Sequence, residues 1–204
     1  MMKSIKNEVI TTIEINKSKF INYLIPVSNV EEVSTILQTL RKKHYDANHH
    51  TYAYIIGFDQ ENQKCSDDGE PSKTAGYPML DVLKKNELTN IINISVRYFG
   101  GVKLGAGGLI RAYMKSCTSG LENAEFSTLQ TLIDISVQIP FDEIGNVEPY
   151  LRDHFVISDT QYNNSVTYYL TVQDIDLVNI EQVLRDSTKG IAVVSVLNQY
   201  ETFQ

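Results

Sequence analysis

Five glycines fall within nine consecutive positions of one segment, RYFGGVKLGAGGLIRAY at 97–113, called here the glycine segment. They are Gly100, Gly101, Gly105, Gly107 and Gly108. Glycine lets backbone N–H groups approach a ligand closely, and the first N–H groups of a helix have no partner within that helix. Arg97, Lys103 and Arg111 add positive charge. The combination predicts a cradle for an anion, such as a phosphate, at the start of a helix.

The glycine segment also permits a purely structural interpretation. A tight turn that packs a helix against a sheet would need glycines for the same backbone reasons. The spacing departs from both common phosphate motifs, since no Gly-Lys-Ser/Thr closes it and Ile110 stands where the dinucleotide fingerprint needs a third glycine. The anion site and the structural turn therefore both stay open.

A second stretch, CSDDGEPSKTAGYPML at 65–80, is called here the acidic segment because it holds Asp67, Asp68 and Glu70. These carboxylates would bind a divalent metal with upstream histidines, hold a turn through backbone N–H groups, or pair with the cations of the glycine segment. The histidines in question are His44, His49 and His50. We expect no metal and no cofactor. We expect instead a supporting loop made of His49, Asp67, Asp68, Glu70, Lys73 and Thr74, whose acids steady Arg97, Lys103 and Arg111 around an anion pocket.

No catalytic residue is expected. Cys65 lies among acids, which raise the pKa of a thiol and so disfavour the reactive thiolate. Ser66, Ser72 and Thr74 have no evident base nearby, and Cys117 falls on an apolar helical face.

The elements that must position these segments follow from the apolar spacing in residues 1–128. It predicts strands at 9–27 with a turn at 16–19, then a helix from Ser28 or Asn29 to residue 43. A strand at 51–58, a loop at 59–76, a helix at 78–88, a strand at 91–96 and a buried helical face at 109–121 complete the first domain. We place a domain boundary near 125–131.

The remaining residues, 131–204, predict a smaller domain with the order β-α-β-β-α-β, the split βαβ arrangement. Strands are expected at 132–140, on either side of a hairpin turn at Asn163–Asn164, and after Gly190. A helix is expected near 148–155, and a second begins with Asp174 or Asp176 as its cap.

Charge is divided unevenly along the chain, whose net charge is −7. Residues 1–130 hold 15 Lys/Arg and 14 Asp/Glu, whereas residues 131–204 hold 3 Lys/Arg and 11 Asp/Glu. Any contact with phosphates is therefore expected in the first part. Two cysteines without CxxC spacing, no signal peptide and no long apolar run predict a cytoplasmic protein without a membrane contact.

Five blocks in order resemble the IMPACT/YigZ family in its bacterial two-domain form: KSKFI (17–21), ANH (47–49), AYIIG (53–57), SDDGEPSKTAGYPML (66–80) and the glycine segment. The resemblance covers nearly all of residues 1–125. It implies an α+β protein with an N-terminal domain like domain 2 of ribosomal protein S5 and a ferredoxin-like C-terminal domain similar to the last domain of elongation factor G. Both folds recur in translation proteins.

Two residues depart from the family pattern. Lys73 stands where the family usually has glycine, and Tyr77 stands where it usually has a basic residue. The eukaryotic relatives, which regulate translation by binding an activator of a stress kinase, carry a further domain ahead of this module, so that partner is not expected here.

The resemblance implies a non-enzymatic, translation-linked regulatory or binding protein that contacts RNA, a ribosome-associated partner or another phosphate-bearing ligand through its first domain. Two alternatives stay open. One is a Mg²⁺-dependent enzyme acting on a small phosphorylated substrate, and the other is a protein-interaction module whose acidic second domain docks a basic partner. The sequence gives no expectation for the oligomeric state.

Overall fold

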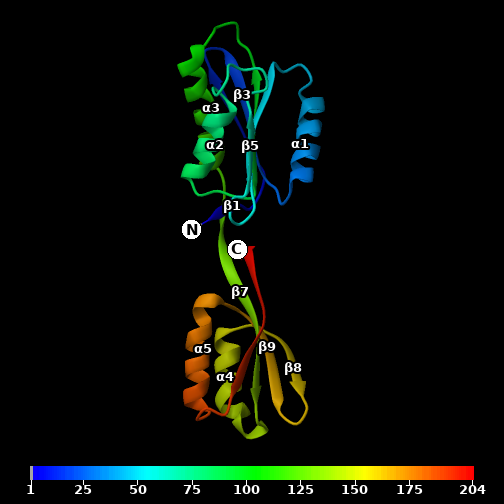
Figure 1. Ribbon diagram of the computed structural model, residues 1–204, viewed down its shortest axis with the longest axis vertical. Coiled ribbons are helices and arrows are strands. Elements are labelled where there is room, and N and C mark those ends of the chain that lie inside the picture. The colour runs from blue at the N-terminus through cyan, green and yellow to red at the C-terminus, as the bar shows by residue number, and fades with distance from the viewer. Residues whose placement is uncertain (1) are drawn as a thin grey trace. The chain divides into compact units, whose positions relative to one another are not determined.

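The computed structural model describes residues 2–204 as an α+β protein with two antiparallel sheets (Figure 1). Contacts between residues divide the chain into two compact units. The first unit reaches Leu129, and the second begins at Gln130.

The sheet of the first unit has the order β2–β3–β6–β4–β5, and all neighbouring strands are antiparallel. The strands are β2 (Val9–Ile15), β3 (Ser18–Pro26), β4 (His49–Ile56), β5 (Asn62–Ser66) and β6 (Ile91–Tyr98). Because β6 lies between β3 and β4, Phe20 and His49 are both directly opposite Arg97. This register brings residues of three strands together at one point of the sheet.

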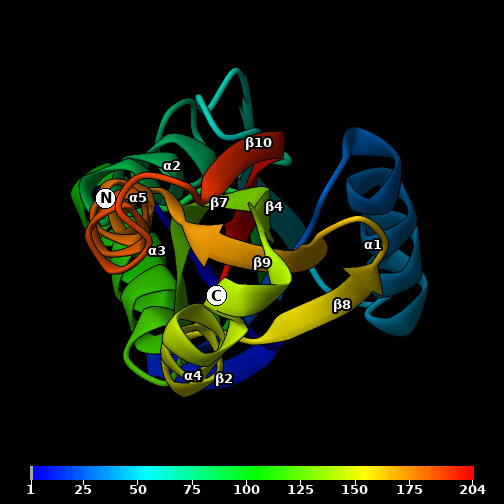
Figure 2. The same cartoon turned by 90° about the horizontal axis from the view of Figure 1, so that it is seen from below.

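Three helices cover the two faces of this sheet. Helix α1 (Val30–Lys43) lies on one face, and α2 (Gly76–Lys85) and α3 (Gly105–Leu121) lie on the other (Figures 1 and 2). Strand β6 is buried along nearly its whole length, with Ile91, Ile92, Ile94 and Val96 as its apolar residues and Asn93, Ser95 and Arg97 as buried polar ones. The predicted turn between β2 and β3 is confirmed, since Asn16 and Lys17 both have positive φ, as a two-residue hairpin turn requires.

Asn29 is the cap of α1, one of the two residues expected there. Its side chain accepts a hydrogen bond from the N–H of Glu32 at 2.9 Å, and the Glu32 side chain accepts one from the N–H of Ser28 at 2.8 Å. The pair satisfies the N–H of Glu32 in the first turn and the N–H of Ser28 just before the cap residue.

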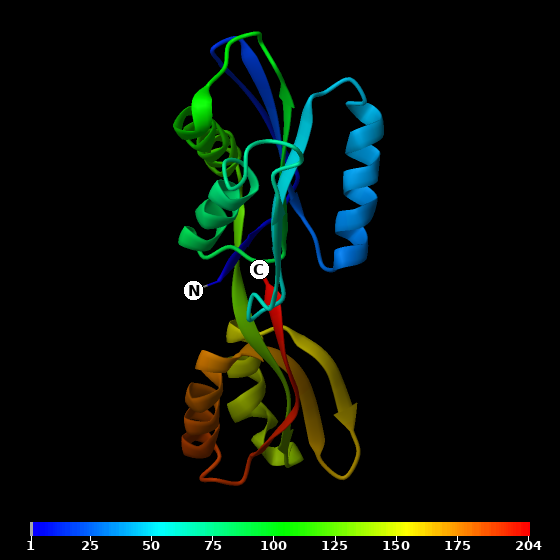
Figure 3. The ribbon, with the colours of Figure 1, turned by 45° about the horizontal axis from the view of Figure 1, so that its top comes forward.

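The second unit contains four strands in the order β10–β7–β9–β8. Along the chain, helix α4 follows β7 and helix α5 follows β9. Both helices pack on the same face of the sheet (Figure 3). The elements are β7 (Phe126–Ile139), the short helix η1 (Phe141–Glu143), α4 (Ile144–His154), β8 (Ile157–Tyr162), β9 (Val166–Gln173), α5 (Asp174–Ser187) and β10 (Val193–Phe203).

Three expectations about elements are wrong. Residues 59–76, expected as one loop, contain β5, because Asn62–Ser66 pair with β4 at the sheet edge although they carry few apolar side chains. The strand expected at 132–140 begins earlier, as β7 from Phe126, because Phe126–Thr128 pair with the N-terminal strand β1 (Lys3–Ile5). Asp174 and Asp176 lie inside the first turn of α5, whose cap residue is Gln173.

Candidate ligand-binding site

Asp67 holds the backbone at the start of α2. Its carboxylate accepts hydrogen bonds from the N–H groups of Lys73 at 2.7 Å and of Ala75 and Gly76 at 2.9 Å each. Ala75 is the cap position of α2, and its side chain accepts no hydrogen bond. Asp67, which lies outside the helix, therefore satisfies the open N–H groups that a capping side chain would otherwise satisfy.

Asp68 ties the acidic segment to α1 and β4. Its carboxylate accepts hydrogen bonds from the Arg41 guanidinium and from the N–H of His50, both at 2.6 Å. Its backbone carbonyl lies 2.8 Å from Nδ1 of His49. Burial acts to raise the pKa of Asp68, but the hydrogen bonds from Arg41 and His50 outweigh it and lower the pKa below its usual value.

Glu70 is the one acid that reaches the glycine segment. Its Oε1 atom lies 2.7 Å from Nη1 of Arg97 and accepts a hydrogen bond from the Tyr113 hydroxyl at 2.6 Å. Nε2 of His49 is 3.8 Å from the same oxygen. The Glu70 and Arg97 side chains are only 4% and 6% exposed, so this is a buried ion pair. Burial, followed by the hydrogen bond to Glu70, raises the pKa of Tyr113, which keeps its proton and donates it.

Arg97 is fixed from several sides at once. Its guanidinium lies between the rings of Phe20 and Phe99, with ring centroids 5.4 and 5.6 Å from Cζ. Nη2 donates a hydrogen bond to the Ser18 hydroxyl at 3.3 Å, while Nε is buried and has no hydrogen-bond partner among residues 2–204. Because Glu70 neutralises this cation, Arg97 cannot serve as a free anion-binding charge.

The glycines of the glycine segment have different roles. A Cβ on Gly100 would lie 1.9 Å from the carbonyl oxygen of Lys17, so the close approach of the β2–β3 turn requires glycine there. Gly101 and Gly105 have φ of +84° and +68°, a region that glycine tolerates best. Helix α3 begins at Gly105, so Gly107 and Gly108 lie in its first turn and not in the preceding loop.

A pocket of about 230 Å³ opens at the start of α3. Arg97 and Glu70 contribute polar groups to its lining, and Lys103 is its exposed cation. The other lining residues are Pro71, Phe99, Leu104, Gly105, Ala106 and Leu109. Leu104 is the cap residue of α3 and gives no side-chain hydrogen bond, so the first N–H groups of this helix keep free hydrogen-bonding capacity.

The predicted network forms only in part. The structure brings Glu70, His49 and Arg97 together, whereas Asp67 and Asp68 bind other partners. Lys103 and Arg111 form no ion pair within residues 2–204. Arg111 does not line the pocket; its Nη1 atom lies 3.6 Å from the place where a Cβ on Gly107 would be. Charge alone could not assign each acid its partner, because backbone N–H groups and Arg41 compete for the same carboxylates.

Lys73 and Thr74 have structural positions. Thr74 is buried, and its hydroxyl donates a hydrogen bond to the carbonyl of Pro71 at 2.7 Å. Lys73 is exposed and has φ of +61°, a region that glycine tolerates best, which fits the glycine that the family resemblance implies at this position.

Three residues of the site escaped sequence reasoning. Ser18 links Arg97 to the N–H of Gly100 at 3.2 Å, Phe99 forms part of the pocket, and Tyr113 completes the partners of Glu70. The matching blocks KSKFI and RYFGG contain Ser18 and Phe99. Tyr113 lies in the same matching block as Phe99, but its helical spacing is that of ordinary core residues and gives no separate signal.

The described residues contain no group of three or more His, Cys, Asp and Glu side chains able to hold a metal ion. Both cysteines are free thiols. Burial and then Asp67 raise the pKa of Cys65, and burial raises that of Cys117, so neither thiol is activated as a nucleophile.

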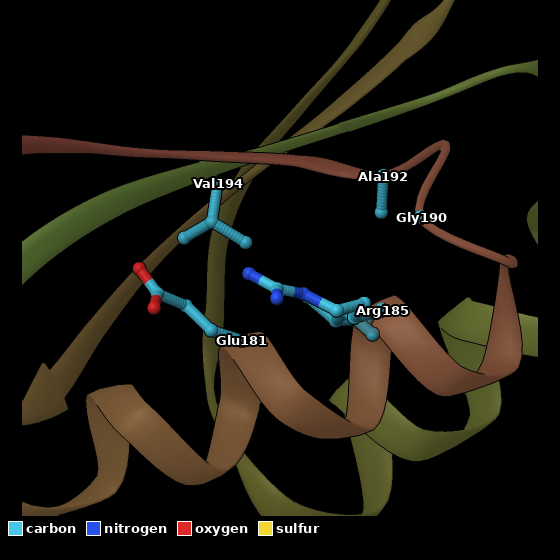
Figure 4. A pocket seen from close by; sticks show the side chains of 6 residues that line it. Glu181, Arg185, Gly190, Ala192 and Val194 are labelled. Carbon is cyan, nitrogen blue, oxygen red and sulfur yellow. The ribbon is translucent and has the colours of Figure 1, made fainter.

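The second unit has a pocket of its own, of about 310 Å³, between α5 and β10 (Figure 4). Arg185 and Glu181 extend from the helix towards Val194, and Leu184, Gly190 and Ala192 complete the lining. One cation and one anion leave this lining without net charge, and it contains no aromatic side chain. It therefore offers less for recognising a ligand than the pocket at α3.

No helix in the described part of the chain combines the length and the apolar character needed to cross a bilayer.

Comparison with known proteins agrees with the motifs at this site. A family model, the Impact N-terminal domain, matches residues 16–121. IMPACT family member YvyE of Bacillus subtilis is 38% identical over 179 residues, which cover 87% of this chain and 82% of the relative. An IMPACT family member of Haemophilus influenzae is 38% identical over 197 residues, which cover 94% and 95% of the two chains.

Similarity extends to a solved structure. The crystal structure of a hypothetical protein superposes with a TM-score of 0.61 at 28% sequence identity, over 97% of each chain. Since the family model spans more than half of the chain and the bacterial relatives match it almost end to end, the chain belongs to the IMPACT family.

Proposed function

We propose that this protein is a non-enzymatic, translation-linked binding protein that holds RNA or another phosphate-bearing ligand at the start of α3. One observation carries the proposal. An exposed cation without an ion pair among residues 2–204, Lys103, lies at a pocket beside a helix N-terminus that no side chain caps. N–H groups and a positive dipole end at such a helix start favour a negatively charged group.

Further cations near this end of the sheet support the same assignment. Gly100 lies against the turn that carries Lys17, and its N–H donates a hydrogen bond to the hydroxyl of Ser18, the first residue of β3, at 3.2 Å. Lys17 and Lys19 are exposed, as is Arg111 on α3. A local group of cations of this kind suits a short stretch of phosphates better than a long duplex, because the chain as a whole is acidic.

The fold assignments implied by the family belong to the same proposal. The strands lie in the order β10–β7–β9–β8, and along the chain a helix follows β7 and another follows β9. This arrangement supports a ferredoxin-like second domain. For the first domain we propose the fold of ribosomal protein S5 domain 2, and for the protein a cytoplasmic location. The fold resemblance to translation proteins favours an RNA ligand, but it does not identify which RNA is bound.

Fluorescence anisotropy with labelled tRNA and ribosomal RNA fragments, across a salt series, tests the proposal. The variant Lys103→Ala/Arg111→Ala should bind more weakly than the unmodified protein. For single strands, the slope of log affinity against log salt should fall by roughly 0.7 for each phosphate that the variant no longer neutralises.

The matched control is Lys42→Ala/Lys84→Ala, which removes the same charge from exposed positions of α1 and α2. It should change affinity only slightly. If the two double variants bind alike, the start of α3 is not the binding site and the proposal fails.

A further inference from the structure

The interior of the pocket at α3 does not suit an anion. Glu70 places a carboxylate in its lining, and the neighbouring Arg97 charge is already balanced by that carboxylate. A phosphate pushed inward would meet a buried negative group without a free cation to offset it. The phosphate must therefore stay at the mouth, where Lys103 and the first N–H groups of α3 lie.

The remaining lining favours an uncharged group with apolar faces. Pro71, Leu104 and Leu109 form apolar parts of the lining, and Phe99 contributes an aromatic ring that is 46% exposed. Arg97 packs against that ring, with Cζ 5.6 Å from its centroid. A volume of about 230 Å³ gives room for one flat ring system.

The pocket also has a carboxylate oxygen without a partner among residues 2–204. All hydrogen bonds and ion pairs of Glu70 with residues 2–204 use Oε1, which leaves Oε2 without such a partner. A carboxylate oxygen of this kind, in a residue that lines the pocket, accepts hydrogen bonds from the edge of a ligand that carries N–H donors.

We propose that the pocket takes a single unpaired nucleotide of an RNA strand, with its base against Phe99 and its phosphate at Lys103. The inference rests on the proposed function and adds to it a preference for single-stranded over double-stranded RNA. A base held within a duplex cannot enter the pocket, whereas every unpaired base has a flat face able to stack on an aromatic ring.

The test compares four substitutions on two forms of one labelled RNA, the single strand and the same strand annealed to its complement. Phe99→Ala should weaken binding of the single strand by about 5- to 150-fold, the range for loss of one base–aromatic stack. Its effect on the duplex should be small. Lys103→Ala should weaken binding of both forms.

Val102→Ala is the matched control, because Val102 is an apolar side chain of the same segment, 43% exposed, that does not line the pocket. It should leave both affinities unchanged. Phe99→Tyr keeps the ring and should keep the single-strand preference, which tests whether an aromatic ring at this position is sufficient.

Four results would overturn the inference. Equal affinity for strand and duplex would refute the nucleotide pocket, and so would equal effects of Phe99→Ala and Val102→Ala. In either case, weaker RNA binding by Lys103→Ala would leave the proposed function intact. If the protein bound neither the single strand nor the duplex, both the nucleotide pocket and the proposed binding of RNA would be refuted. Adenosine monophosphate binding as tightly as the strand would identify a free nucleotide as the source of the base and refute the RNA assignment.

Discussion

The acidic segment and the glycine segment lie in the same unit, and the fold uses the three carboxylates of the first differently from the three cations of the second. Every carboxylate of the acidic segment has a partner: Asp67 the backbone of α2, Asp68 Arg41, and Glu70 Arg97. In the glycine segment, Arg97 alone is paired, whereas Lys103 and Arg111 form no ion pair within residues 2–204.

This difference separates charges that hold the structure from charges left for a ligand. A buried charge must be paired, since its removal from water costs several kcal/mol per ion in real proteins. An exposed cation carries no such cost and stays available for a ligand. The difference also changes the meaning of the predicted network, because its acids organise the backbone and only Glu70 reaches the pocket.

The largest effect is expected from Glu70→Ala, which leaves Arg97 buried without its counter-charge. The free energy of unfolding of the first unit should fall by about 3–5 kcal/mol, as for other broken buried pairs. Hydrogen exchange of peptides from β6 measures this unit separately from the second. The double variant Glu70→Leu/Arg97→Met should recover most of the loss, and failure to recover would show that the pair is not the cause.

Asp67→Ala should come next, at roughly 2 kcal/mol, because three backbone N–H groups lose an ionised acceptor while water replaces part of it. Protection of α2 against hydrogen exchange should fall most. Asp59→Ala removes the same charge from an exposed loop position and should change little. Equal effects of the two variants would indicate that net charge, and not the hydrogen bonds of Asp67, is what matters.

Asp68→Asn should cost roughly 1 kcal/mol at neutral pH, since Arg41 is half exposed and an amide still accepts one hydrogen bond. The pKa of Asp68 is lowered in the folded state, so the unfolded chain takes up this proton first as pH falls. The stabilisation is complete above the unfolded pKa and is lost as pH falls through the folded pKa. The difference between the protein and its variant should therefore vanish at low pH in thermal unfolding, and a constant difference would contradict the role of this carboxylate.

The smallest effect on stability is expected in the glycine segment. Lys103→Ala and Arg111→Ala should each change the free energy of unfolding by no more than about 0.5 kcal/mol, as is usual for exposed side chains. The same hydrogen-exchange measurement checks this. A loss comparable with that of Asp67→Ala would mean that these cations serve the fold, and the contrast between the two segments would disappear.

Much of the fold could be predicted from residue patterns. The turn at Asn16–Lys17, the capped helix α1 and the hairpin at Asn163–Asn164 all follow from local rules of backbone and side-chain spacing. Strand β5 and the start of β7 could not be predicted in this way, because each exists through pairing with a strand far along the chain. Helix α3 begins earlier than its apolar spacing indicates, because glycines in its first turn weaken the local helical signal.

The candidate site shows the same division. Residue types alone marked Arg97, Glu70 and Lys103 as chemically important. They could not indicate that Glu70 cancels the charge of Arg97, which depends on contact between β6 and a loop 27 residues earlier in the chain. Nor could they single out Phe99, since exposure of an aromatic ring is decided by its neighbours.

Residue types and local spacing were enough to indicate the family, most of the helices and strands, and the charged residues of the site. Each of these features depends on residues that are close together in the sequence. The folded chain was needed to show which charges are neutralised, which helix end is uncapped and which ring faces a pocket. Pairing and burial are properties of residues brought together from distant parts of the chain, and the electrostatic cost of burial then determines which charges remain available to a ligand.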